Sequence, residues 1–382
     1  MREGATGKRR LVTVLLLGLL AAGALVRHAA LAMPRAGSGD AGEPGELTVP
    51  ARRPNVVFIL ADDLDLVLGS LDSMPRVKAL LADQGTTFSH FFVPLSLCCP
   101  SRATILLGQY PHNHKIYTND LPDGGFDLFR SLGHESRTLG PALQAAGYRT
   151  FFAGKYINGY PDVADRTYIP PGWDEWHVPS NDDAYSEFNY ELNERGALAK
   201  FGAAPTDYLT DVLRARSHRF LLDHRGSAQP FFLYVAPYAP HKPATPAPRH
   251  ANLFPKARVP RTPSFNEADV SDKPRQYRDL PPLSAGDVQS LDDLYRLRLQ
   301  SLQAVDELVA KLVTTLAATG ELDNTYVVFS SDNGFHMGQH RLMASKYTAY
   351  EEDIRVPLIV RGPGVPAGRV VDALASTVDL AP

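Results

Sequence analysis

Hydrophobic positions along this chain follow two patterns, which together predict alternating strands and helices. Short, continuous apolar runs rich in β-branched and aromatic residues are typical of strands that are buried on both faces. Longer stretches in which apolar residues recur every three to four positions are typical of helices that bury one face. The apolar runs are Asn55–Ala61, 148–154, 230–238, Thr325–Ser331 and 356–360.

The helical pattern is clearest in a long stretch near the C-terminal end, residues 287–320. Two shorter helices are predicted at 74–85 and 137–147, each ending at a glycine, and another opens near Pro100. Because strands and helices alternate, we predict an α/β fold with a mostly parallel central sheet sandwiched by helices. The apolar face of the long helix consists of Leu291, Leu294, Leu302, Val305, Val309 and Leu312.

One segment departs from this alternation. Residues 240–282 contain ten prolines and no apolar periodicity. A segment of this length without regular structure is either a functional loop or disordered, and the sequence leaves both open.

The N-terminus has the composition of an export signal. A basic stretch at residues 7–10, an apolar run at 11–26 and Ala-Leu-Ala at 30–32 predict a signal peptide over residues 1–32. A linker rich in Gly, Pro and Ala follows at 33–52, so we expect a secreted, extracytoplasmic protein. The alternative is an uncleaved anchor, which is the only membrane contact that the sequence indicates.

The length and net charge of the chain restrict the classes of function that it can have. A chain of 382 residues with 44% hydrophobic residues can bury a sizeable core. Its net charge of -3 provides no basic surplus to meet phosphates, which argues against a general nucleic-acid-binding protein.

Polar side chains follow four of the predicted strands at their carboxyl ends. In open parallel sheets, ligands bind beyond those ends, so residues far apart in sequence converge there. Carboxylate and amide oxygens suit Ca²⁺ or Mg²⁺, and Ca²⁺ tolerates irregular geometry better. Each acidic pair taken alone also fits an ordinary turn or helix cap. The residues are Asp62 and Asp63, Lys155, His241, and Asp332 and Asn333.

The two cysteines of the chain are adjacent, at Cys98 and Cys99. Two adjacent cysteines cannot cross-link distant segments of the chain through a disulfide between them, and such a disulfide would be strained. Cys98 lies where the predicted helix begins, a position at which free backbone N–H groups bind anions, and Arg102 adds a cation. The alternative is a buried structural cysteine.

"CCPSRATILLG", Cys98 to Gly108, resembles the sulfatase signature C-x-P-S-R-x-x-x-L-x-G. The resemblance extends to "RPNVVFILADDLD", "GKYINGY", "APYAPHKP", "SDNGFHMGQH" and "DIRVPLIVRGPG", and so covers residues 53–382. It implies an alkaline-phosphatase-like sulfatase catalytic domain over 53–382. In that family "STVDLAP" leads into a helix and a smaller antiparallel C-terminal subdomain, so we expect the domain to be truncated at its C-terminal end.

The resemblance also implies a nucleophile. In sulfatases the first signature cysteine, here Cys98, is oxidised by a formylglycine-generating enzyme to formylglycine (3-oxoalanine). One hydroxyl of the hydrated aldehyde attacks sulfur, and deprotonation of the other then expels sulfate. Serine would not allow that last step, which explains the need for a modified cysteine.

Further roles follow from the same resemblance. Arg102, Lys155 and Lys346 are implied to neutralise charge on the sulfate and nucleophile, and His241 to protonate the leaving oxygen. Without the resemblance, Lys346 would be read as a solvated lysine. The implied ligands of one Ca²⁺ per chain are Asp62, Asp63, Cys98, Asp332 and Asn333.

Ile157 departs from many sulfatases, which have histidine two residues after the strand-end lysine. The branch that contains N-acetylglucosamine-6-sulfatase and the heparan 6-O-endosulfatases shares this change. It implies hydrolysis of 6-O-sulfate on glucosamine units of a sulfated saccharide. His112, His114 and His336 are candidates for the missing hydrogen bond. The alternatives are a phosphonate monoester or phosphodiester hydrolase of the same superfamily and an inactive glycan-binding homologue.

Two aromatic stretches remain, at residues 172–177 and 181–190. They either shape a sugar-binding rim or pack against their own loops.

Overall fold

The computed structural model describes residues 52–161 and 165–381. The predicted signal peptide, residues 1–32, and residues 33–51 of the predicted linker lie outside the described residues. No helix within the described ranges combines the length and apolar content that a bilayer span requires.

Within the described residues, ten strands form one mixed sheet in the order β10-β2-β9-β8-β1-β7-β3-β4-β5-β6. The central run from β8 to β4 is parallel, which confirms the predicted mostly parallel sheet, although β4 itself was not predicted as a strand. Antiparallel pairs join β2, β9 and β8 on one side and β4, β5 and β6 on the other. The strands are β1 Asn55–Ala61, β2 Thr86–Phe92, β3 Arg149–Gly154, β4 Glu175–Pro179, β5 Glu191–Glu194, β6 Ala197–Lys200, β7 Phe231–Ala236, β8 Thr325–Ser331, β9 Leu358–Arg361 and β10 Arg369–Ser376.

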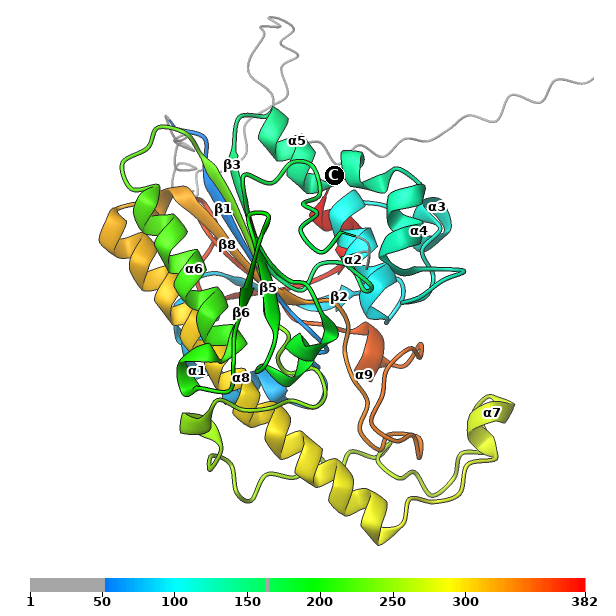
Figure 1. Cartoon of the computed structure of the whole chain (residues 1–382). Coiled ribbons are helices and arrows are strands. Elements are labelled where there is room, and N and C mark those ends of the chain that lie inside the picture. Colours follow the sequence, from blue (N-terminus) through cyan, green and yellow to red (C-terminus); the bar gives the residue numbers. More distant parts are fainter. Residues whose placement is uncertain (1–51, 162–164, 382) are drawn as a thin grey trace, which may run out of the picture. The chain divides into compact units, whose positions relative to one another are not determined.

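Helices cover both faces of this sheet (Figure 1). The long helices α6 and α8 lie side by side on one face, and α2, α4 and α5 lie on the other. The helices are α1 Pro75–Val77, α2 Cys98–Leu107, α3 Pro111–His114, α4 Gly125–Ser131, α5 Leu139–Ala145, α6 Leu209–Asp223, α7 Arg275–Arg278, α8 Ala285–Thr319 and α9 Glu351–Ile354.

Strand β1 explains why its apolar run is continuous. Val57 and Ile59 point into the core beneath α6 and α8, and Phe58 and Leu60 point into the core beneath α2. Successive residues of a strand face opposite sides, so a strand covered on both faces is apolar throughout.

Helix α8 matches its predicted length closely. It begins with a capping box at Ser284 and Asp287 and ends at Gly320, which adopts a left-handed conformation (φ 75°). The predicted helix at 74–85 is irregular, because α1 continues into a wider turn at Lys78–Ala82.

The strands β2, β6 and β10 were not predicted from the sequence, for a physical reason. Strands β6 and β10 are largely exposed, and β2 is only half-buried, so none has the continuous apolar run of the central strands. Residues 240–282 form a loop with two short helical turns, anchored by buried Val259 and Val270. This favours the loop alternative over disorder.

Candidate active site

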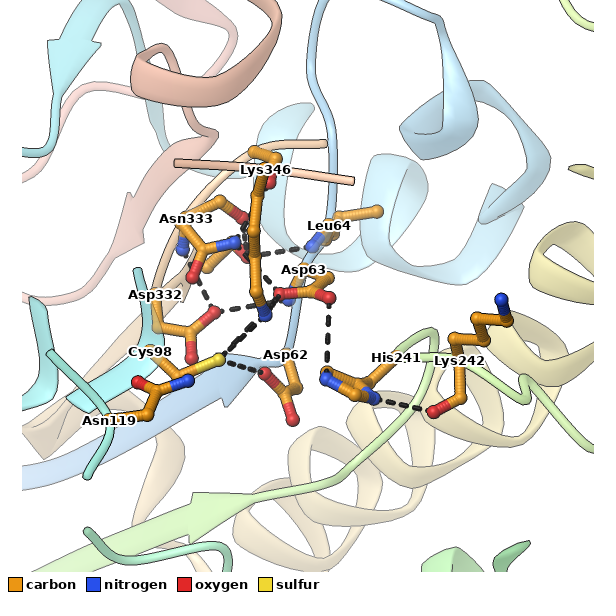
Figure 2. Close-up of polar contacts among 12 residues, drawn as sticks. Asp62, Asp63, Leu64, Cys98, Asn119, His241, Lys242, Asp332, Asn333 and Lys346 are labelled. Carbon is orange, nitrogen blue, oxygen red and sulfur yellow. Dashed lines mark hydrogen bonds and ion pairs between the residues drawn. The ribbon is translucent and has the colours of Figure 1, made fainter. Parts of the chain in front are cut away.

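Four adjacent parallel strands, β8, β1, β7 and β3, end at one edge of the sheet, where the predicted site residues converge. The N-terminus of α2 brings Cys98 to the same place (Figure 2). Ligand atoms of Asp62, Asp63, Cys98 and His241 all lie within 4.8 Å of one another.

Asp62 is fully buried among cations. Lys155 Nζ lies 2.7 Å from its Oδ2, and Arg102 Nη2 lies 3.7 Å from its Oδ1. Burial alone would raise the pKa of Asp62, but Lys155, His241 and Arg102 outweigh it and hold that pKa well below its usual range. Asp62 is therefore ionised in the fold.

Asp63 adopts a left-handed backbone conformation (φ 66°), which aspartate tolerates better than most residues. Its N–H donates to Asp332 Oδ1 at 3.0 Å. Its own Oδ1 contacts Lys346 Nζ and accepts from Asn333 Nδ2 at 2.8 Å. Its Oδ2 lies 3.6 Å from His241 Nε2 and is buried without a hydrogen bond.

Asp332 holds Arg102 in place. Its Oδ2 accepts from Arg102 Nε at 2.8 Å, and Arg102 Nη1 donates to the Lys155 carbonyl at 2.6 Å. Burial raises the pKa of Asp332 to about 6, with a further rise from Asp62, although Arg102 lowers it. Three carboxylates thus share one buried space.

Cys98 is the first residue of α2 and is buried, with no disulfide partner. Its Sγ lies 3.5 Å from Asp62 Oδ1 and 2.7 Å from Lys346 Nζ (Figure 2). Burial raises the pKa of the Cys98 thiol to about 12, so the unmodified thiol is neutral and a weak nucleophile. The helix terminus offers fewer free donors than predicted, because the Cys99 N–H donates to Asn119 Oδ1.

Lys346 comes from the loop between β8 and β9. Backbone hydrogen bonds pair Ser345 with His336, and the Tyr347 N–H donates to the Ser96 carbonyl at 3.0 Å. These contacts hold the lysine against Cys98, and its side chain is only 11% exposed. Lys346 is therefore not the solvated lysine that the sequence pattern alone suggests.

The residues present fit a hard divalent cation. Asp63 Oδ2 and Asn333 Oδ1 are buried oxygens without a hydrogen-bond partner, and Asp62 and Asp332 add two more carboxylates. Asn333 directs its Nδ2 at Asp63, so binding through Oδ1 requires its side-chain amide to turn over. No sulfur or imidazole is needed for such a set.

The charges also fit an anionic substrate. Three buried carboxylates, Asp62, Asp63 and Asp332, face three cations of the site: Arg102, Lys155 and Lys346. A bound divalent cation would leave an excess of two positive charges, which favours an anion in the site.

His241 lies at the more open side of the site, with its side chain 23% exposed. Its Nδ1 is 2.6 Å from the Lys242 carbonyl, which leaves Nε2 directed at the site. Burial lowers the pKa of His241, and Asp63 and Asp62 oppose this shift.

The three histidines that were candidates for the missing hydrogen bond contact residues outside the predicted catalytic set. His114 lies behind α2, where its Nε2 is 3.1 Å from Thr104 Oγ1. His336 Nδ1 contacts Asp353 at 2.9 Å, and His112 stacks on Tyr110. Among the described residues none of the three hydrogen-bonds a predicted catalytic side chain, and Ile157 packs in the apolar core.

The two aromatic stretches behave differently. Trp173 and Trp176 are buried in the core beneath α2 and shape no rim. Tyr185, from the second stretch, packs against His241 with ring centroids 4.6 Å apart. Of the two stretches, only the second thus reaches the site.

Sequence reasoning missed Arg298. This fully buried residue donates from Nη2 to the Asp63 carbonyl at 2.6 Å and to Asp65 Oδ1 at 3.0 Å. The available signal was an arginine on the apolar face of a long helix, between Leu291 and Leu302.

Comparison with known proteins gives a consistent result. A family model described as "Sulfatase" matches residues 54–382. N-acetylglucosamine-6-sulfatases from Capra hircus and Homo sapiens are each 42% identical to this chain, over 87% of it and 60% of the relative. A putative extracellular sulfatase Sulf-1 homolog from Caenorhabditis elegans is 41% identical over 86% of this chain and 46% of the relative. The chain therefore spans less than two thirds of the length of these relatives.

Solved structures share the fold. One, of a protein in complex with its substrate D-glucosamine-2-N,6-O-disulfate, has a TM-score of 0.67 and 23% identity, covering 86% of this chain and 75% of that chain. The phosphonate monoester hydrolase of Agrobacterium radiobacter has a TM-score of 0.66 and 22% identity, covering 86% and 72%. At these identities the likeness establishes the α/β architecture alone.

Proposed function

The chain belongs to the sulfatase family, and from that premise we propose that residues 53–382 are a catalytic domain that hydrolyses sulfate esters. One observation carries the proposal. The signature cysteine, Cys98, contacts both a buried carboxylate, Asp62, and a buried ammonium group, that of Lys346. A nucleophile beside concentrated positive charge is what attack on an anionic ester requires.

Formylglycine made from Cys98 is the proposed nucleophile. The thiol itself is a poor candidate, because its pKa of about 12 leaves it protonated at neutral pH. When present, the hydrated aldehyde supplies a hydroxyl group for attack on sulfur. A formylglycine-generating enzyme is the maturation partner that this modification requires.

Asp62, Asp63, Asp332 and Asn333 are proposed to hold one Ca²⁺, with residue 98 as a further ligand. When bound, the ion lowers the pKa of an attached hydroxyl group and offsets negative charge. The unpartnered Oδ2 of Asp63 supports this assignment, and Asn333 offers its Oδ1 once its side-chain amide turns over.

The remaining residues act on the substrate directly. Arg102, fixed by Asp332 and the Lys155 carbonyl, presents a guanidinium group to the sulfate oxygens. Lys155 and Lys346 reduce the repulsion between nucleophile and sulfate. His241 donates a proton to the leaving oxygen from Nε2, since Nδ1 is directed at the Lys242 carbonyl.

The proposed substrate is a 6-O-sulfated glucosamine unit of a glycan. Support comes from the relatives named N-acetylglucosamine-6-sulfatase. The sequence resemblance to the same branch, which includes Ile157, points in the same direction. Residues 1–32 are proposed to direct export and residues 33–52 to link the signal to the domain. An extracytoplasmic location gives access to such glycans.

The test is sulfate release from defined saccharides that differ only in the sulfated position. Mature protein should release sulfate from 6-O-sulfated glucosamine faster than from N- or 3-O-sulfated controls, and Cys98→Ala should release none. Faster turnover of a phosphonate monoester or phosphodiester would refute sulfate ester hydrolysis as the main activity. Saccharide binding without turnover, by protein from its native host, would support the inactive homologue.

A further inference from the structure

Tyr185 packs against two residues of the proposed machinery. Its ring centroid lies 4.6 Å from that of His241 and 5.1 Å from Lys155 Nζ. Tyr238 meets it edge-on, with centroids 4.9 Å apart. The Tyr185 ring therefore contacts both His241, the proposed proton donor, and Lys155, a proposed sulfate-binding cation.

His241 needs such a neighbour. Among the described residues, its ring forms one hydrogen bond, to the carbonyl of the adjacent Lys242, and its Nε2 is 3.6 Å from Asp63 Oδ2, too far for a hydrogen bond. That single hydrogen bond still lets the ring pivot about it, and the tyrosine ring, tilted by 49° against the imidazole, restricts this rotation.

The segment that carries Tyr185 is firmly held. Tyr185 lies in a 3-10 helix, Asp182–Ser186, between β4 and β5, and the neighbouring Ala184 is fully buried. Just after that helix, the Glu187 carboxyl group accepts hydrogen bonds from Thr210 N at 2.8 Å and from its hydroxyl. Thr210 belongs to α6, so Tyr185 is positioned by the main helical layer and not by a free loop.

The tyrosine hydroxyl has a minor part in this packing. It accepts a hydrogen bond from Asn158 Nδ2 at 3.4 Å, near the limit for such a bond. The cavity beside it, lined by Lys155 and Tyr238, measures about 20 Å³ and has room for one water molecule. A sugar ring does not fit in that cavity.

We propose that Tyr185 is a positioning residue that fixes the His241 imidazole for protonation of the leaving oxygen. This inference rests on the proposed function. It assigns a role to a side chain that neither the sulfatase signature nor the metal-binding pairs include. The ring, not the hydroxyl, carries the role.

Leaving-group dependence tests the proposal. A sugar alkoxide needs protonation as it leaves, whereas a nitrophenolate leaves without it. Tyr185→Ala should therefore lower kcat on a 6-O-sulfated glucosamine substrate by roughly 10²-fold, and lower kcat on nitrophenyl sulfate by less than about threefold. Tyr185→Phe should restore kcat on the sugar substrate.

Two controls separate positioning from general damage. Phe188→Ala loosens the same segment, since Phe188 packs on Tyr208, and it should affect both substrates equally. Adding Tyr185→Ala to His241→Ala should cause no further loss, because the two residues act as a unit.

Equal losses of kcat on both substrates, or full additivity with His241→Ala, would overturn the inference. Failure of the proposed function would be seen in the wild-type protein itself, either as no sulfate release from both substrates or as faster turnover of a phosphonate monoester or phosphodiester.

Discussion

Arg298, in α8, donates from Nη2 to the backbone carbonyl of Asp63 at 2.6 Å, across 235 residues of sequence. The same guanidinium pairs with Asp65 at 3.0 Å and donates to the Pro240 carbonyl at 3.2 Å. One buried cation thus connects the longest helix to the end of β1 and to the loop that carries His241. This contact ties the helical layer to the edge of the sheet that carries the proposed active site.

Replacing Arg298 with Met should lower both stability and activity. The Asp65 carboxylate would be left buried and unpaired, which costs roughly 3–5 kcal/mol in the free energy of unfolding. Urea unfolding followed by circular dichroism measures this loss, and sulfate release measures activity. Adding Asp65→Asn should recover part of the stability but not the activity, because the Asp63 carbonyl still lacks its donor. Wild-type stability in Arg298→Met would contradict this account.

Lys346→Met should reduce kcat/KM by about 10²–10³-fold, since the ammonium group beside residue 98 is proposed to stabilise charge that develops in the transition state. Steady-state kinetics on a 6-O-sulfated saccharide check this expectation. Lys256→Met, at an exposed site, makes the same change in charge and should leave kcat/KM unaltered. Comparable losses of kcat/KM in the two variants would show that the loss comes from the change in net charge, and not from the position of Lys346 beside residue 98.

Removal of divalent cations should abolish turnover while the domain stays folded, because Arg102, Lys155 and Lys346 already balance the three carboxylates. Returning Ca²⁺ should raise the melting temperature, with a stabilisation of about 2.7 kcal/mol when the ion is at 100 times its Kd. Differential scanning calorimetry measures the shift. Asp63→Ala should remove the shift and Asp279→Ala, at an exposed site, should not. A wild-type protein indifferent to Ca²⁺ would rule out the proposed metal site.

Glu187 predicts a pH dependence of stability that is independent of the metal. Burial raises its pKa to about 8 from an ordinary 4.5, although hydrogen bonds from Thr210 oppose the rise. The folded state therefore binds this proton more tightly than the unfolded state, so the stabilisation is complete below pH 4.5 and is lost as pH rises toward 8. The full effect is on the order of 5 kcal/mol.

Chemical unfolding at several pH values tests this expectation. Glu187→Gln should flatten the decline in unfolding free energy between pH 4.5 and 8, whereas Glu351→Gln, at an exposed site, should follow the wild-type curve. A decline of the same size in Glu187→Gln would place its origin elsewhere in the protein.

The central apolar strands and the long helix α8 were predictable because the sequence of each one alone carries the signal for its structure. Strand β1 is apolar throughout since it is covered on both faces, and α8 carries its own cap and terminator at Ser284 and Gly320. The edge strands β6 and β10 carry no such signal. Their pairing depends on neighbouring strands, and their side chains are mostly exposed.

The strand-end residues of the site were predictable from topology, since parallel strands end at one edge. Lys346 lies in a loop with no periodic pattern, and only the family resemblance indicated it. The contacts of Arg298 and Tyr185 join segments that are distant in sequence. The local signs were limited to a buried arginine on an apolar helix face and the aromatic stretch 181–190, whose partner in the site the sequence did not indicate.

The identity of residue 98 in active protein tests the central claim most directly. Peptide mass spectrometry over residues 96–102, on protein from its native host whose sulfate release has been measured, reports the chemical form of that side chain. The account predicts a peptide in which one oxygen has replaced the sulfur and two hydrogens of Cys98, in proportion to activity. Full activity in protein that carries only the unmodified thiol would contradict it.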